Sequence, residues 1–256
     1  MAVLSERARQ LDVSLTEIQL EQIKHYCLAL AEYNAHTNLV SDASPQRLVL
    51  DHILDSLTLV KFARGLAQAR ERAPAALRLI DIGSGAGLPG LILAISMPEA
   101  NITLLDSIGK KVKFLQSFIA AAGLSDRVQA IAGRAELLGH QKRYRERFDV
   151  ATARAVGSFA LVAELALPLL RVGGRLCLQK SLSQLDDVSG EATQVLPKLG
   201  GLLTETAVLD ACVLGKERVI FVVEKASKTA PGYPRTWAQI KNQPLATLPG
   251  DAKIRG

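Results

Sequence analysis

A glycine-rich loop between a predicted strand and a predicted helix carries the clearest chemical signal in the chain. The loop, Asp81–Gly90, reads Asp-Ile-Gly-Ser-Gly-Ala-Gly-Leu-Pro-Gly. Glycines suit such a loop because the backbone turns sharply and a ligand must approach it closely. The dinucleotide fingerprint GxGxxG is not met, since Leu88 stands where its third glycine would be. The spacing of Gly83, Gly85 and Gly87 instead suits a nucleoside without a pyrophosphate clamp, with a plain tight turn as the alternative.

Two further strand ends supply the polar groups that would complete a nucleoside site. Asp106 ends the second predicted strand, 25 residues after Asp81, and its carboxylate can accept both hydroxyls of a ribose. The same aspartate could instead cap the helix that follows. The tetrapeptide Gly133-Arg134-Ala135-Glu136 follows the third predicted strand, where the edge of an adenine would lie. Because open α/β sheets bind ligands at the carboxyl ends of their strands, these positions together predict a nucleoside cofactor.

Alternating strands and helices from residue 77 onward must hold these loops in place. Apolar runs predict seven strands, at residues 77–80, 102–105, 128–131, 148–152, 175–179, 204–209 and 218–223. Helical patterns separate most of them, at residues 90–97, 110–122, 159–170 and 190–199. The last two strands have no predicted helix between them, which suggests one antiparallel strand. The pattern predicts an α/β, Rossmann-like fold with a mostly parallel seven-stranded sheet and helices on both faces.

The N-terminal part of the chain is predicted to be helical. Ser14 and Glu17 have the spacing of a capping box, in which the two side chains satisfy free backbone N–H groups. Apolar residues then recur at steps of three and four, as on one buried helix face. A second helix is predicted to start at Ser44-Pro45, because proline is favoured at the first helical position. An alanine- and arginine-rich connector follows at residues 67–74.

The excess positive charge is concentrated near the C-terminus. From Lys225 onward there are six basic residues and one acid, which accounts for +5 of the net charge of +6. A second basic cluster contains Lys142, Arg143, Arg145 and Arg147. Localised positive charge suits a polyanionic partner, because each neutralised phosphate releases counterions. A solvated basic surface without a partner is the alternative.

Two aromatic residues in the tail leave two interpretations open. Tyr233 and Trp237 lie beside Arg235 and Lys241, so they could stack on bases of a nucleic acid. Equally, the tail could pack over the rest of the domain.

A hydrolase triad is the third chemistry that the sequence suggests and then disfavours. His52, Asp55 and Ser56 lie within five residues on one predicted helix. Side chains at such spacing face outward together and cannot converge on a substrate as side chains from separate loops do. We therefore expect a hydrogen-bonded helix cap or a domain contact there.

Several classes of site and location are excluded by composition. Three cysteines without a CxxC pair argue against a disulfide framework. Four histidines show no HExxH or similar spacing, so we expect no metal. The best apolar run, residues 161–170, is too short for a membrane span and contains Glu164. Charged residues near the N-terminus disfavour a signal peptide, so a cytoplasmic protein is expected.

The motifs taken jointly resemble the RsmG (GidB) family of bacterial small-subunit ribosomal RNA methyltransferases. The resemblance covers residues 25–245, and its motifs separate this family from methyltransferases that share only the glycine loop and the strand-end acid. The segments that carry it are Tyr33-Asn34, Asn38-Leu39-Val40, His52–Leu57, Asp81–Gly90, Leu105-Asp106-Ser107, Lys110-Lys111, Phe114-Leu115, Arg134-Ala135-Glu136, Arg154-Ala155-Val156, Tyr233-Pro234-Arg235 and Pro244-Leu245. Leu88 departs from the phenylalanine of many members, and residues 236–242 depart from the tail of the family.

The resemblance implies a class I methyltransferase domain at residues 76–225, after a helical region at 1–75 and before a basic tail at 226–256. It implies that S-adenosylmethionine is the cofactor and that the substrate is a guanine of 16S ribosomal RNA, free or in the small subunit, methylated at N7. The protein is expected to be a monomer that binds no metal and does not associate with a membrane. The predicted cofactor-binding residues are Gly83, Gly85, Leu88, Asp106, Ser107, Ile108, Ala135, Glu136 and Arg154.

No catalytic residue is assigned at this point, because guanine N7 has a free lone pair and needs no general base. The alternatives are a methyltransferase that acts on small molecules and, with less support, an NAD-dependent dehydrogenase. The tail charge argues against the first of these and Leu88 against the second.

Overall fold

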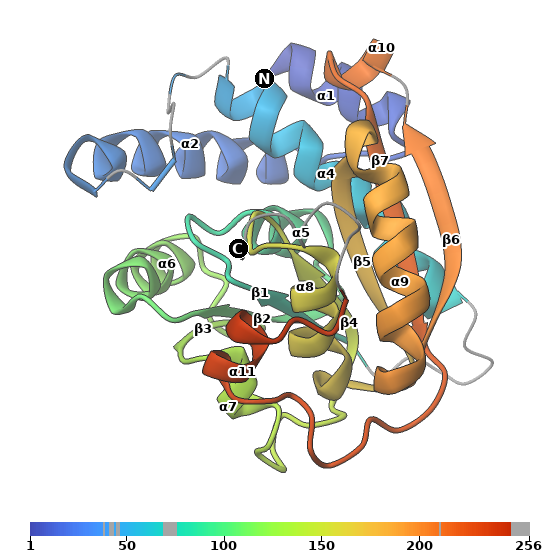
Figure 1. Cartoon of the computed structure of the whole chain (residues 1–256). Coiled ribbons are helices and arrows are strands. Elements are labelled where there is room, and N and C mark those ends of the chain that lie inside the picture. Colours follow the sequence, from blue (N-terminus) through green and yellow to red (C-terminus); the bar gives the residue numbers. More distant parts are fainter. Residues whose placement is uncertain (38, 41–43, 45–46, 69–75, 210, 247–256) are drawn as a thin grey trace.

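A seven-stranded sheet with helices on both faces forms the centre of the computed structural model (Figure 1). The structure describes residues 1–37, 39–40, 44, 47–68, 76–209 and 211–246. The strands are β1 (Leu77–Ile82), β2 (Ala100–Asp106), β3 (Val128–Ala132), β4 (Phe148–Ala153), β5 (Leu170–Ser181), β6 (Gly201–Leu209) and β7 (Arg218–Lys225). Their order across the sheet is β3-β2-β1-β4-β5-β7-β6.

The pairing of the strands confirms the predicted α/β fold with a mostly parallel sheet. Strands β3, β2, β1, β4 and β5 pair in parallel, while β7 runs antiparallel to both β5 and β6. The order reverses between β1 and β4, which is the switch point where doubly wound sheets bind ligands. One detail of the prediction is wrong, because a short helix, α10 (Ala211–Leu214), lies between β6 and β7.

Two hydrophobic cores, one on each face of the sheet, hold the helices in place. Alternate strand residues point to opposite faces, so Leu79 of β1 belongs to the first core and Ile80 to the second. The first core packs against α1 (Ala2–Gln10), α2 (Glu17–Thr37), α4 (Leu54–Gln68), α5 (Gly90–Ser96) and α6 (Gly109–Ala121). The second packs against α7 (Ala135–Leu138), α8 (Phe159–Ala166), α9 (Leu185–Leu199) and α11 (Trp237–Asn242).

The N-terminal helices share the first core with the sheet. A π-helical turn, η1 (Leu48–Ile53), leads directly into α4, and α2 packs over α5 and α6 (Figure 1). The predicted capping box is two residues out of register, because Thr16 and Gln19 form it: the Gln19 N–H donates to Thr16 Oγ1 at 3.3 Å, and the Thr16 N–H donates to Gln19 Oε1 at 2.9 Å. Asn38, Pro45 and most of the predicted connector at 67–74 lie outside the described residues.

The tail, residues 226–246 in the structure, packs against the domain from β7 to α11 along the lower edge of Figure 1. The guanidinium of Arg145 holds it by donating to the carbonyls of Thr229, Ala230 and Tyr233 at 2.7–3.2 Å. Of the two interpretations of the tail, packing over the domain is therefore the one observed. The domain boundaries at 75 and 225 stay predictions.

Several of the basic residues that suggest a polyanionic partner make internal contacts instead. Lys225 is fully buried and donates to the carbonyl oxygens of Leu167 at 2.8 Å and Leu199 at 3.2 Å. Arg235 pairs with buried Glu164, and Lys253 and Arg255 lie outside the described residues. The described tail therefore presents less free positive charge than composition suggests, because composition does not distinguish a buried cation from a solvated one.

Candidate active site

A cavity of about 260 Å³ opens at the carboxyl ends of β1, β2 and β3. Five of the nine predicted cofactor-binding residues line it, and they are Gly83, Asp106, Ser107, Ala135 and Glu136. The remaining lining residues are Ile82, Leu105, Gly133, Arg134, Val156, Leu165 and Trp237. Its volume is just below the range of about 300–1,000 Å³ that is usual for ligand pockets, so it suits one part of a larger ligand.

Asp106 joins the glycine loop to the start of α6. Its side chain is buried, with Oδ2 accepting from the Gly85 N–H and Oδ1 accepting from the Ile108 N–H, both at 2.8 Å. Each carboxylate oxygen can accept a further hydrogen bond, so the group can still bind two ribose hydroxyls. Gly85 and Ile108 do not line the cavity, and the geometry gives them a supporting role through Asp106. Leu88 is buried in the first core and also lies off the cavity.

Gly83 is the glycine at which the loop needs the missing side chain most. Its φ is +69°, and a Cβ built there would lie 2.6 Å from Val156 Cγ2. Gly83 also donates its N–H to the Leu105 carbonyl at 2.8 Å, which ties the loop to the end of β2. The loop can therefore take this path beside the cavity only without a side chain at residue 83.

Replacing Gly83 by alanine should weaken cofactor binding by about 10-fold or more, since both the left-handed backbone and the clash oppose it. Gly123→Ala is the matched control, because its φ is +66° but a Cβ there meets no atom within 4 Å. Calorimetric titration with S-adenosylhomocysteine measures the difference. Equal affinities for the two variants would contradict this account of Gly83.

Asp81 is the first residue of the loop, and its side chain holds the loop through buried hydrogen bonds instead of lining the cavity. The side chain is fully buried, with Oδ1 accepting from Thr152 Oγ1 at 2.9 Å and Oδ2 accepting from the Gly90 N–H at 3.1 Å. Burial raises the pKa of Asp81 from 3.8 to about 6, against the opposing effect of its hydrogen bonds. A Cβ at Gly90 would lie 2.7 Å from Asp81 Oδ2, so the close approach also requires this glycine.

The raised pKa of Asp81 predicts a pH effect on stability. At Asp81 the folded state binds a proton more tightly than the unfolded state does. The resulting contribution to the free energy of unfolding is therefore full below pH 3.8 and is lost as pH rises through about 6. The stability of the wild type relative to Asp81→Asn should fall by about 3 kcal/mol over this window, because asparagine does not ionise. Urea denaturation of both proteins from pH 3.5 to 8 measures it, and parallel curves would refute the prediction.

A second, larger cavity of about 570 Å³ adjoins the first, with Val156 lining both. Arg154 lies in this larger cavity, and its role in cofactor binding stays a prediction. The other lining residues come from η1 and α4, from β4 and the loop after it, from α8, from the end of β5 and the turn after it, and from the segment that leads into β7. They are Asp51, His52, Asp55, Ala153, Ala155, Gly157, Val162, Leu178, Gln179, Lys180, Ser181, Gln184, Lys216 and Arg218.

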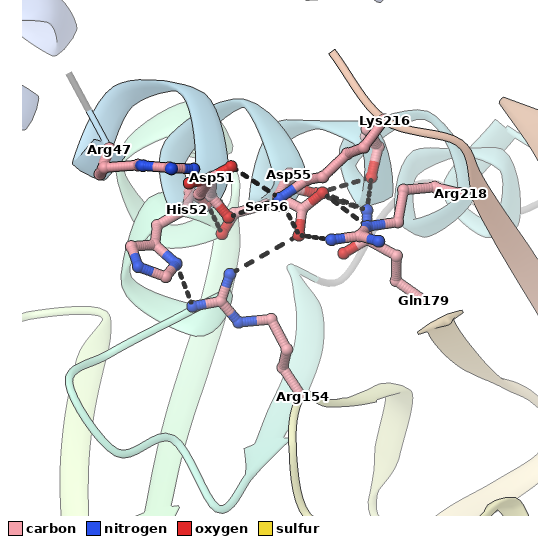
Figure 2. A network of polar contacts seen from close by, with 10 residues as sticks. Arg47, Asp51, His52, Asp55, Ser56, Arg154, Gln179, Lys216 and Arg218 are labelled. Atoms are coloured by element: carbon pink, nitrogen blue, oxygen red, sulfur yellow. Dashed lines mark hydrogen bonds and ion pairs between the residues drawn. The ribbon is translucent and has the colours of Figure 1, made fainter. Parts of the chain in front are cut away.

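Asp55 is the centre of a polar network in the larger cavity (Figure 2). Its buried carboxylate accepts from Arg218 Nε and Gln179 Nε2, each at 3.1 Å, and lies 3.9 Å from Arg154 and from Lys216. Lys216 also pairs with Asp51 at 3.0 Å. The network joins the N-terminal helices to three strand ends and surrounds two carboxylates with cations.

His52 accepts a hydrogen bond in this network. Arg154 can only donate, so its 3.2 Å contact makes His52 Nδ1 the acceptor. Burial lowers the pKa of His52, and the charge of Arg154 lowers it further, so the ring is neutral at pH 7. Burial also lowers the pKa of Arg154, while Asp55 opposes this shift.

The expectation of a structural contact at His52, Asp55 and Ser56 holds in part. Ser56 Oγ donates to the His52 carbonyl at 2.6 Å, so the three side chains form no hydrolase relay. The expectation that the cluster faces outward is wrong, because Asp55 and Ser56 are buried and His52 and Asp55 line the larger cavity. A signal was available, because His52 and Asp55 are three positions apart and a helix therefore places both side chains on one face.

The described part of the chain contains neither a metal-binding cluster nor a membrane-spanning helix. No group of three or more His, Cys, Asp or Glu side chains is arranged there to hold a metal ion. Within the same residues, no helix is long and apolar enough to cross a membrane.

The doubly wound sheet with its antiparallel strand β7, the glycine loop and the carboxylate at the end of β2 define a class I methyltransferase that uses S-adenosylmethionine. Comparison with known proteins agrees with this class. The chain belongs to the GidB family, described as rRNA small subunit methyltransferase G, whose sequence model matches residues 19–203.

Curated relatives match most of the chain. The ribosomal RNA small subunit methyltransferase G of Leuconostoc citreum is 37% identical over 234 residues, which cover 91% of this chain and 94% of the relative. The protein of the same name from Roseiflexus castenholzii is 39% identical over 222 residues, covering 86% and 89%. That of Desulfitobacterium hafniense is 35% identical, covering 93% and 94%.

Proposed function

We propose that this protein transfers a methyl group from S-adenosylmethionine to N7 of a guanine in 16S ribosomal RNA, acting in the cytoplasm on the free RNA or on the small subunit. The observation that carries the proposal is a nucleoside-sized cavity at Asp106 that meets a larger, cation-lined cavity at Val156, in a chain of this family. The names of the relatives support ribosomal RNA over a small molecule as the acceptor.

The residues of the smaller cavity suit the adenosine part of the cofactor. Asp106 would accept the ribose hydroxyls, and Ala135 and Glu136 would meet the adenine edge. Gly83 lets the ligand approach the backbone closely. When bound, S-adenosylmethionine supplies an electrophilic methyl group on a cationic sulfur. The rest of the cofactor would extend past Val156, because the smaller cavity is too small for the whole molecule.

The larger cavity suits the guanine. Because N7 carries a free lone pair, the protein must align it with the methyl carbon at about 3–3.5 Å and exclude water. Arg154 can donate to guanine O6, whereas a bond to N7 would block the attack. Neutral His52 and the carboxylate of Asp55 hold the Arg154 guanidinium from the other side. The role of these residues is therefore orientation, with no proton to remove.

Transfer of labelled methyl groups to small-subunit RNA and to small subunits from a strain that lacks this gene tests the function. Label in N7-methylguanine is the expected result, located by mass spectrometry of RNA fragments. Small subunits from the parent strain are the control, since their target is already methylated and should accept no label. If neither substrate from the deletion strain is labelled, the proposed acceptor is wrong.

A further inference from the structure

We infer that Trp237, in the part of the tail that departs from the family pattern, forms one side of the adenine site and reports its occupancy. The inference rests on the proposed function, because it assigns a ligand to the smaller cavity. Trp237 lines that cavity together with Gly83, Asp106 and Glu136, although it is 131 residues beyond Asp106 in the chain. It is the only tryptophan in the sequence.

The chemistry of the cavity suits a flat purine with polar edges. Glu136 is buried and offers carboxylate oxygens, while Trp237 offers a broad apolar ring that is 37% exposed. Arg134 contacts both residues: its Nε donates to Glu136 Oε1 at 2.5 Å, and its guanidinium carbon lies 5.0 Å from the centre of the Trp237 ring. Stacking of a base on an aromatic side chain contributes about 1–3 kcal/mol and does not need a particular base.

Contacts of the residues on both sides of Trp237 fix the backbone that carries its ring. On one side, Arg235 donates to buried Glu164 through Nε and Nη2, each at 2.8 Å. On the other, the side chain of Ile240 is buried in the second core. Thr236 caps α11 in a capping box with Gln239, which fixes the first turn of the helix. The backbone at Trp237 is therefore fixed before a ligand arrives, so that less conformational entropy is lost on binding.

Titration with S-adenosylhomocysteine, followed by tryptophan fluorescence and by calorimetry, tests the inference. We expect the emission of Trp237 to change saturably, with the dissociation constant that calorimetry gives. Trp237→Ala should weaken binding about 10-fold, and Trp237→Phe should recover most of the loss because it keeps an aromatic face. The same losses are expected for 5′-methylthioadenosine, which lacks the amino acid part of the cofactor.

Lys241→Ala is the matched control, because Lys241 is an exposed residue of the same helix and does not line this cavity. It should bind as the wild type does, and the unfolding midpoint of Trp237→Ala should stay near that of the wild type. Unchanged affinity of Trp237→Ala, or emission that stays constant while calorimetry shows saturation, would overturn the inference alone. Wild-type protein that does not bind S-adenosylhomocysteine would overturn the proposed function as well.

Discussion

Arg235→Ala is expected to lower the free energy of unfolding by about 3–5 kcal/mol, which is typical when one partner of a buried ion pair is removed. Its partner Glu164 is 1% exposed, and Arg235 donates to both of its carboxylate oxygens. Without the guanidinium, the carboxylate is left buried with only the backbone N–H of residue 235 as a donor. Urea denaturation at pH 7 measures the loss.

A surface pair on the same protein serves as the control for this prediction. Arg64 contacts Glu99 at 2.9 Å, but the two side chains are 36% and 50% exposed. Arg64→Ala should therefore cost less than about 1 kcal/mol. Arg235→Ala should also weaken S-adenosylhomocysteine binding, because it releases the segment that holds Trp237. A loss no larger than that of the surface variant would contradict the role given to Arg235.

Asp106→Ala should weaken the binding of S-adenosylhomocysteine by about 100-fold or more, which corresponds to about 3 kcal/mol. The substitution removes the carboxylate that would accept hydrogen bonds from the ribose, and hydrogen bonds to charged groups contribute about 1.5–3 kcal/mol each. The substitution also removes the acceptor of the Gly85 and Ile108 N–H groups, so that the loop loses its tie to α6. Calorimetric titration gives the affinity.

Two substitutions sharpen the test of Asp106. Asp106→Asn keeps one acceptor oxygen and should lie between alanine and the wild type. Asp126→Ala removes an exposed acid of the same charge and should leave the affinity unchanged. If Asp106→Ala binds within threefold of the wild type, the ribose contact must be assigned to another residue.

The polar residues that line the smaller cavity could be predicted from the sequence because their signals are local. Gly83, Asp106 and Ala135-Glu136 each follow an apolar run of strand length. Parallel strands bring their carboxyl ends to one edge, so residues about 25 apart in the chain must meet there. Helix boundaries are harder to predict, as the capping box shows: two overlapping matches occur within six residues, and the hydrogen bonds form at Thr16 and not at Ser14.

The sequence by itself determined the α/β fold and the polar groups at the three strand ends where the smaller cavity opens, because hydrophobic periodicity and the residues that follow each strand are local features of the chain. Only the tertiary structure decided which residues line the second cavity, since Arg154 meets His52 across 102 positions of the chain. It also decided which tail cations are free, because Lys225 and Arg235 make hydrogen bonds and an ion pair inside the protein. In addition, it placed Trp237 beside Gly83 in the smaller cavity. Pairing and burial of side chains depend on how distant segments pack, and composition and spacing do not contain that information.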